Sequence, residues 1–287
     1  MKQKKKIKRQ HTENPWIPWL LIGISVIFFV IMLVVPLFEV IYRSLKDGIS
    51  TYTDAITAKN TLSAMRVTLL ATVIAVVINT FFGLCASWLL TKFNFKGKHA
   101  LSTLIDIPFS VSPVIGGLAF IMTFGRMGWA TPAVEWFNKT FGTDIALVFS
   151  VPGVVLATIF VTFPFVSREL IPVMQAQGTA EEEAAALMGA KGFTIFKKIT
   201  FPHIRWALVY GIILCAARAF GEFGAVNAVS KTRGKTFTLP LEIDALYMAG
   251  SADSITQAFA VSSLLVLLAL IMLVLKQIVE YRGKRDS

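Results

Sequence analysis

Residues 16–41 read WIPWLLIGISVIFFVIMLVVPLFEVI, an apolar run in which Glu39 is the one charged side chain. The hydrocarbon core of a bilayer needs about 20 mostly apolar residues per helix, so this run is long enough to span it. A secretory signal peptide has a shorter apolar segment and then a small-residue cleavage site, whereas residues 36–44 read PLFEVIYRS. We therefore predict an uncleaved first membrane helix.

Five further apolar stretches cover residues 65–90, 101–124, 146–166, 206–229 and 258–279. Of the 287 residues, 55% are hydrophobic and 16% are charged, whereas a typical soluble domain is about 25% charged. Cys85 and Cys215 lie inside apolar runs and are expected to be buried thiols. The composition excludes a large soluble enzyme, a disordered protein and a disulfide scaffold. We predict an all-α integral membrane protein with six spans in residues 16–279 and tails at 1–15 and 280–287.

The lysines and arginines predict the orientation of the chain. Most of the 28 lie in the N-terminal tail, near residues 92–98, in the loop 167–205 and in the C-terminal tail. Cytoplasmic loops carry an excess of basic residues, so these segments, and with them both termini, are expected to be cytoplasmic. The basic tail is expected to lie on anionic membrane lipids rather than to bind nucleic acid.

The loop 167–205 contains a predicted helical hairpin. Thr179 is expected to start a helix, with Glu182 completing a capping box. Gly189 is placed to end this helix, and a second short amphipathic helix is expected over 193–200, before Pro202 and the next span. The hairpin is either a simple connection between two spans or a docking element for a cytoplasmic partner.

The spacing within this hairpin resembles the EAA motif of ABC importer permeases. The matching residues are Glu183, Ala184, Ala185, Gly189, Ile199 and Pro202. Phe201 is a departure, because the family usually has leucine before the proline. The resemblance implies a six-helix, type I ABC importer permease whose hairpin is a coupling helix that enters a groove on the ATP-hydrolysing subunit. These six residues would then form or support that contact.

The chain shows no nucleotide or metal site of its own. A P-loop that ended in Gly234-Lys235-Thr236 would need glycine where Val229 stands. The histidines His11, His99 and His203 lie far apart in the sequence. We therefore expect a transport subunit that is not an enzyme and binds no cofactor, with ATP and Mg²⁺ held by a separate ATPase.

The fifth predicted span carries two charges, Arg218 and Glu222, four residues apart. This spacing places them on one helix face, where they can form an ion pair. In one interpretation the pair only neutralises itself, and Gly221 and Gly224 allow tight helix packing, for example against a second permease. Alternatively, Arg218 lies beside the passage of an anion and Glu222 fixes its geometry, because charges at this depth usually face a polar path.

The same stretch, ARAFGEFGA over residues 217–225, resembles the pattern shared by sulfate and molybdate permeases. RGKTFTLPL over 233–241, followed by Leu246-Tyr247, is similar to the CysW type of sulfate/thiosulfate permease. The resemblance implies a second permease subunit of the CysT type, two copies of an ATPase and an extracytoplasmic sulfate-binding protein. The outer segment 230–257 either meets that binding protein or is an ordinary solvated loop.

The third predicted span contains two prolines and a Gly-Gly pair, which are expected to break or kink its helix. Broken helices at membrane depth are tolerated where they line a cavity or pack in protein. The candidate path residues here are Ser110, Ser112, Gly116 and Gly117. A purely structural kink is the alternative.

These observations predict a multi-pass permease of a bacterial plasma membrane that imports sulfate and thiosulfate, driven by ATP hydrolysis in a partner. The alternatives are a molybdate or tungstate ABC permease and, in a different class, a passive anion channel, which would leave the EAA hairpin unexplained. An intramembrane enzyme has no evident catalytic pair to support it.

Overall fold

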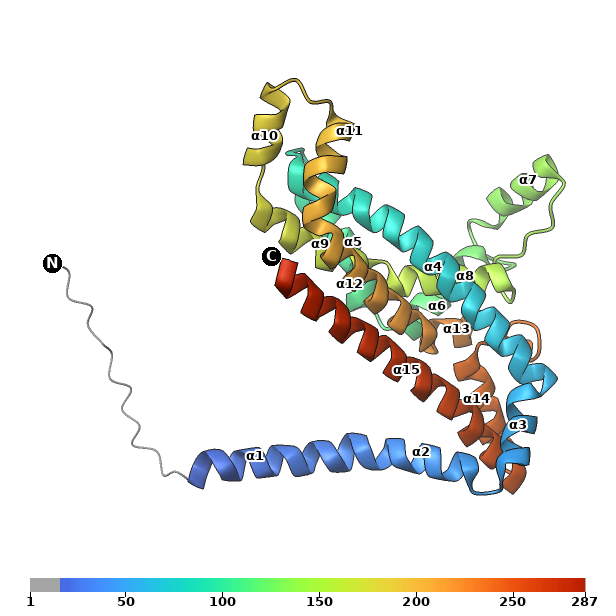
Figure 1. The fold of residues 1–287 in the computed structure, drawn as a ribbon. Helices are drawn as coiled ribbons and strands as arrows, with labels where there is room; N and C mark the ends of the chain where they lie inside the picture. Colours follow the sequence, from blue (N-terminus) through green and yellow to red (C-terminus); the bar gives the residue numbers. More distant parts are fainter. Residues whose placement is uncertain (1–15, 287) are drawn as a thin grey trace.

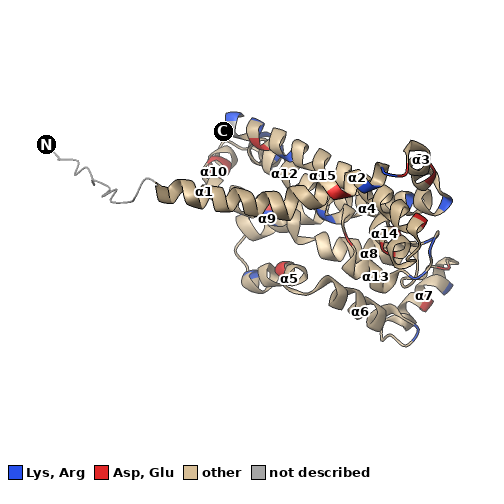
Figure 2. Cartoon of the chain, turned by 90° about the horizontal axis from the view of Figure 1, so that it is seen from below, with Lys and Arg blue, Asp and Glu red and all other residues tan. Residues whose placement is uncertain are grey.

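The computed structural model describes residues 16–286, and the predicted N-terminal tail 1–15 lies outside them. Within the described residues every regular element is a helix (Figure 1). Charged residues are sparse along the helices, and α1 and α6 carry none (Figure 2). The predicted all-α fold is confirmed.

Within residues 16–286, five helical segments are long and apolar enough to cross a membrane. A sixth span is complete only if α5 (Lys98–Ser110) and α6 (Pro113–Phe124) count as one, because they meet at a bend of 107°. The five are Trp16–Leu45 (α1 Trp16–Phe29, η1 Val30–Val34, α2 Val35–Leu45), α4 (Lys59–Lys92), Val151–Gln177 (α8 Val151–Thr162, α9 Pro164–Gln177), Gly192–Phe220 (α11 Gly192–Ile195, η2 Phe196–Thr200, α12 Phe201–Phe220) and α15 (Ala252–Asp286) as far as Gly283.

The break in the third span has a local cause. Proline cannot donate a backbone hydrogen bond, and it drives the residue before it out of the helical region. Accordingly, Ser112 has ψ 132° and Val111 has ψ 137°, and α6 begins at Pro113. The predicted disruption is confirmed, although Pro108 remains inside α5.

The predicted fifth span, 206–229, is wrong at both ends. The helix begins at Gly192 and ends at Phe220, and α13 (Gly224–Val229) is a separate helix. At its start, the predicted short helix 193–200 continues directly into α12 through η2, where the amide of Phe201 bonds the carbonyl of Phe196. This π-helical turn, η2, runs straight into α12, which begins at Phe201. Pro202 therefore lies in a continuous helix and not between two helices.

The core forms where α4 packs against α8, α9 and α12. Its two main buried clusters are aliphatic, one around Val154 and Val226 and the other around Leu170 and Ile204. In contrast, α1 leaves the bundle, and within Trp16–Leu45 only Ser44 is buried (Figure 1).

Three smaller elements lie at the ends of the bundle. The hairpin of α10 (Ala180–Leu187) and α11 stands beyond one end, while α3 (Ile49–Thr57) and α14 (Leu239–Met248) lie at the opposite end (Figure 1). A separate arm, α7 (Thr131–Phe141), projects from the side (Figure 1). Because α14 buries Leu239, Leu241 and Leu246, the segment 230–257 is not an ordinary solvated loop.

Candidate functional site

The hairpin turns at Gly189, as predicted. Its φ of +85° is a conformation that L side chains rarely adopt, and glycine adopts it without a steric cost. The Gly189 amide bonds the carbonyl of Ala186 at 2.9 Å, and the Ala190 amide bonds that of Ala185 at 3.0 Å. These two bonds form the Schellman motif, which satisfies the last carbonyls of α10 and fixes the direction of the chain.

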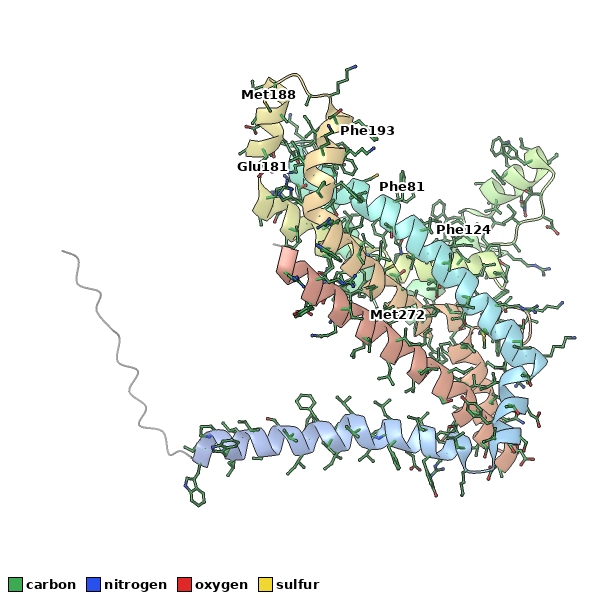
Figure 3. The ribbon with its side chains drawn as sticks, in the orientation of Figure 1. Phe81, Phe124, Glu181, Met188, Phe193 and Met272 are labelled. Atoms are coloured by element: carbon green, nitrogen blue, oxygen red, sulfur yellow. The ribbon has the colours of Figure 1, made fainter. Side chains whose placement is uncertain are left out.

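The tip of the hairpin is apolar and exposed. Leu187, Met188 and Phe193 are 90%, 83% and 76% exposed, and Met188 and Phe193 lie at the end of the hairpin farthest from the bundle (Figure 3). Large apolar patches on a protein surface mark sites of interaction with proteins or membranes. The hairpin therefore presents an exposed apolar tip at the end of the molecule.

The predicted capping box is wrong. The Thr179 side chain makes no capping bond and donates instead to Oε1 of Glu183 at 2.7 Å. Glu182 turns toward the bundle, where its Oε1 lies 2.9 Å from Nζ of Lys92 and accepts a hydrogen bond from Thr200 at 2.7 Å. Glu182 therefore pairs with Lys92 of α4 and not with the backbone amide of Thr179, which a capping box would require.

The six residues predicted from the EAA pattern occupy two places on the hairpin. Glu183, Ala184 and Gly189 are exposed on the first arm, while Ala185 is 7% exposed and faces inward. The second arm carries the other two, the half-buried Ile199 and the exposed Pro202. The exposed residues of the first arm are open to solvent, and the second arm continues into α12.

Arg218 and Glu222 pair as predicted, with 2.6 Å between Nη1 and Oε2. The Arg218 side chain is 32% exposed and that of Glu222 is 1% exposed. Oε1 of Glu222 also accepts a hydrogen bond from the Ala225 amide at 2.8 Å. Glu222 therefore fixes Arg218 and stabilises the start of α13, the separate helix that follows the break after Phe220.

The four candidates in the third span fall into two groups. Ser110 and Ser112 are exposed on either side of the break. Gly116 and Gly117 are buried contacts between helices: a Cβ on Gly117 would lie 2.6 Å from the Ala225 carbonyl oxygen, and one on Gly116 would lie 2.8 Å from Phe160. In this structure the glycines seat α6 against α13 and α8.

Gly221 and Gly224 of the fifth predicted span have different surroundings. A Cβ on Gly224 would lie 3.1 Å from Cβ of Pro113, so this glycine packs within the chain, whereas Gly221 has open space around its Cβ position. Tight packing is therefore seen for Gly224 within the chain, and packing of Gly221 against a second permease stays a prediction.

Two further ion pairs were not predicted from the sequence, one between residues 62 positions apart and one between residues nine positions apart. Arg168 of α9 binds Asp106 of α5 with 2.9 Å between Nε and Oδ1. Arg233 holds Glu242 of α14 through Nε and Nη2, with the closest contact at 2.6 Å. These hydrogen bonds raise the pKa of Arg233 further above its ordinary value. No spacing rule could have found either pair, since each depends on how the chain folds back.

The Arg233 pair lies in a tightly folded segment. Gly234 has φ +77°, its carbonyl accepts a hydrogen bond from Ser63 at 2.7 Å, and a Cβ there would lie 2.8 Å from Oδ1 of Asn60. The Leu239 amide bonds Oγ1 of Thr68 at 2.8 Å. The residues 233–241 therefore lock α14 onto the start of α4.

Comparison with known proteins agrees with this architecture. The family described as "binding-protein-dependent transport system inner membrane component" matches residues 79–285. The chain is 42% identical over 267 residues to the sulfate transport system permease protein CysW of Synechocystis sp., covering 93% of this chain and 94% of that protein. It is also 42% identical over 268 residues to CysW of Escherichia coli, covering 93% and 89%.

Among solved structures, the chain resembles a subunit of a bacterial alginate ABC transporter crystallised with an alginate-bound periplasmic protein. The TM-score is 0.73 with 17% identity, and the match covers 94% of this chain and 95% of that one. A sequence identity of 17% shows only that the two chains share a fold. The chain is thus a multi-pass membrane protein with the type I permease fold, and it belongs to the family of binding-protein-dependent transport system inner membrane components.

Proposed function

We propose that this chain is a permease subunit of an ATP-driven importer of sulfate and thiosulfate. The observation that carries the proposal is the 42% identity, over nearly the whole chain, to two permeases named for sulfate transport. The residues that resemble sulfate permeases also have structural roles here, since 217–225 contains the Arg218–Glu222 pair and 233–241 locks α14 in place.

The hairpin couples the permease to a cytoplasmic ATPase. The apolar tip formed by Leu187, Met188 and Phe193 supplies the contact, and Lys92 and Thr200 hold its base through Glu182. The proposed assembly contains two copies of the ATPase, which bind ATP and Mg²⁺. This chain supplies the surface that converts ATPase movement into movement of its helices.

A second permease subunit, of the CysT type, completes the pathway. An apolar cavity of about 760 Å³ lies between α2, α12 and α15, lined by residues including Leu37, Leu214 and Leu273. Together with the unburied α1, it offers a large apolar surface to a partner helix or to lipid. Half of the translocation path then belongs to each permease, with Arg218 and the exposed Ser110 and Ser112 as candidate path residues from this chain.

The hairpin end is cytoplasmic in this proposal, as are both termini, and the membrane is the bacterial inner membrane. The opposite end then faces an extracytoplasmic sulfate-binding protein. Lys231, Arg233 and Lys235 are exposed there, and positive charge at that surface attracts an anion or an acidic docking face.

The test is uptake of labelled sulfate in a strain that lacks its own importer, with this chain and its proposed partners expressed together. We expect ATP-dependent uptake that resists excess molybdate. Uptake abolished by a small amount of molybdate would assign the chain to molybdate or tungstate instead. Flux without an ATPase would indicate a passive channel, and an assembled complex without uptake of either anion would refute the proposal.

A further inference from the structure

Arg168 and Asp106 join the broken third span to the fourth. Besides the ion pair between them, the guanidinium carbon of Arg168 lies 4.0 Å from the ring centroid of Phe109, one turn after Asp106. Phe109 in turn contacts Phe165 edge-on, with 6.2 Å between ring centroids. The guanidinium is therefore positioned by a carboxylate at one edge and by an aromatic ring across its face.

This arrangement lies within two candidate spans, because the fourth extends from Val151 to Gln177, beyond the predicted end at residue 166, and Arg168 is therefore not in the loop that follows it. At a rise of about 1.5 Å per residue, Asp106 is roughly 12 Å from the start of α5 and Arg168 roughly 14 Å from the end of α9. Their side chains are nevertheless 42% and 44% exposed. Charged side chains at membrane depth face a water-filled path or a partner rather than lipid, so this exposed face belongs to the interior of the assembled transporter.

The two Nη groups of Arg168 form the edge of the guanidinium that can bind an oxyanion. Its hydrogen bond to Asp106 uses Nε alone, and among the described residues neither Nη atom has a hydrogen-bond partner. Arg218 differs, because its Nη1 is held by the buried Glu222. A planar guanidinium with both Nη groups available binds tetrahedral oxyanions through paired hydrogen bonds.

We propose that Arg168 binds the transported oxyanion through its Nη groups, and that Phe109 and Asp106 are positioning residues for it. The inference rests on the proposed function and names a contact residue for that substrate class. The carboxylate of Asp106 offsets part of the attraction for a dianion. A transport site needs this balance, because the ion must be bound firmly enough to enter and loosely enough to leave.

One test measures contact with the anion directly. Cys85 is exposed, so the expectation that it is buried is wrong, whereas Cys215 is fully buried as expected. In the assembled complex with Cys85→Ser, Ser110→Cys then introduces a thiol one turn from Asp106. We expect a membrane-impermeant cationic thiol reagent to label it, and sulfate to slow labelling about threefold or more relative to chloride at equal ionic strength. Adding Arg168→Gln should abolish this protection.

Absence of labelling would place this face against lipid, and labelling that sulfate does not slow would point to lipid phosphate or to no anion at all. Equal protection with and without Arg168→Gln would show that the anion binds elsewhere. Each of these outcomes overturns the inference.

A second test measures transport with matched variants. Arg43 has the same local arrangement, an Nε contact of 2.5 Å to Glu39 and a ring contact to Phe259, but lies at the end of its span. We expect Arg168→Gln to lower sulfate uptake about tenfold or more, Arg168→Lys to lower it less, and Arg43→Gln to leave it unchanged. ATP hydrolysis stimulated by the loaded binding protein should persist in all three.

Asp106→Asn separates an anion contact from a structural latch, because asparagine keeps the hydrogen-bond acceptor and removes the charge. We expect sulfate still to protect Ser110→Cys in this background, and uptake to fall less than in Arg168→Gln, because the hydrogen bond that positions Arg168 remains while the offsetting charge is lost. A loss as large as that of Arg168→Gln would mean that the ion pair itself is required and would overturn the inference. If the wild-type complex takes up no sulfate, the proposed function fails, whereas normal uptake by Arg168→Gln refutes only the contact.

Discussion

The ammonium group of Lys92, at the last residue of α4, lies 2.9 Å from Oε1 of Glu182 in the hairpin. The two side chains are 6% and 15% exposed, so the pair is largely shielded from water. The Lys92 ammonium also donates to the Gly178 carbonyl at 2.6 Å. One side chain therefore fastens the start of α10 to a membrane-spanning helix, and displacement of the hairpin must act on α4.

Replacing Lys92 with glutamine should weaken the transmission of movement rather than docking. Loss of one partner leaves a buried charge unpaired, which typically costs about 3 kcal/mol, so the base of the hairpin should loosen while its tip stays intact. We expect the ATPase to co-purify and the ratio of sulfate imported to ATP hydrolysed to fall several-fold. Lys98→Gln is the control, because Lys98 is bonded only weakly to Asn94, at 3.5 Å. Loss of co-purification with Lys92→Gln would contradict this division of roles.

Gly189 should be intolerant of substitution for conformational reasons. Its φ of +85° costs roughly 1–2 kcal/mol for alanine and is inaccessible to proline, which also lacks the amide that bonds Ala186. We expect Gly189→Pro to insert in the membrane at normal levels and to fail to retain the ATPase on purification, with Gly189→Ala intermediate. Gly192→Ala is the control, since no positive φ or close neighbour constrains that position. If the Gly189→Pro variant retained as much ATPase as wild type, the hairpin would not be part of the docking surface.

Removing Arg218 should affect both stability and transport, and the two effects can be separated. Arg218→Ala leaves the buried Glu222 without its cation, whereas the double variant Arg218→Ala/Glu222→Gln removes the charge as well and keeps an acceptor for the Ala225 amide. We expect the single variant to lower the amount of folded protein and the double variant to restore it. Sulfate uptake that remains low in the restored double variant places Arg218 on the path. Uptake that recovers with protein level indicates a self-neutralising pair.

The Arg233–Glu242 pair should stabilise the end of the bundle opposite the hairpin. Glu242 is 1% exposed, so Arg233→Gln should lower the unfolding free energy by about 3 kcal/mol, measured as a lower thermal midpoint in detergent. The charged form of Arg233 is favoured in the folded state, because its pKa is raised. Its contribution is fully present below the unfolded pKa and is lost only as pH rises through the folded pKa. The difference between wild type and variant due to Arg233 should therefore be constant between about pH 6 and 9.

The sequence by itself determined whatever depends on neighbouring residues. The length of the apolar runs specifies membrane helices, because a bilayer leaves no other way to satisfy the backbone of such a run. Gly189 ends α10 and Pro113 breaks the third span through backbone restrictions that act within one turn. Arg218 and Glu222 pair because four residues are about one helical turn.

Only the tertiary structure decided where long side chains and buried glycines find partners. Glu182 leaves its predicted cap for Lys92, and Arg168 reaches Asp106 62 residues away. Gly117 is required because α13 packs against it, not because of its own helix. Such contacts are decided by which helices pack together and at what height, and the desolvation of charges there outweighs the local preferences that a sequence pattern records.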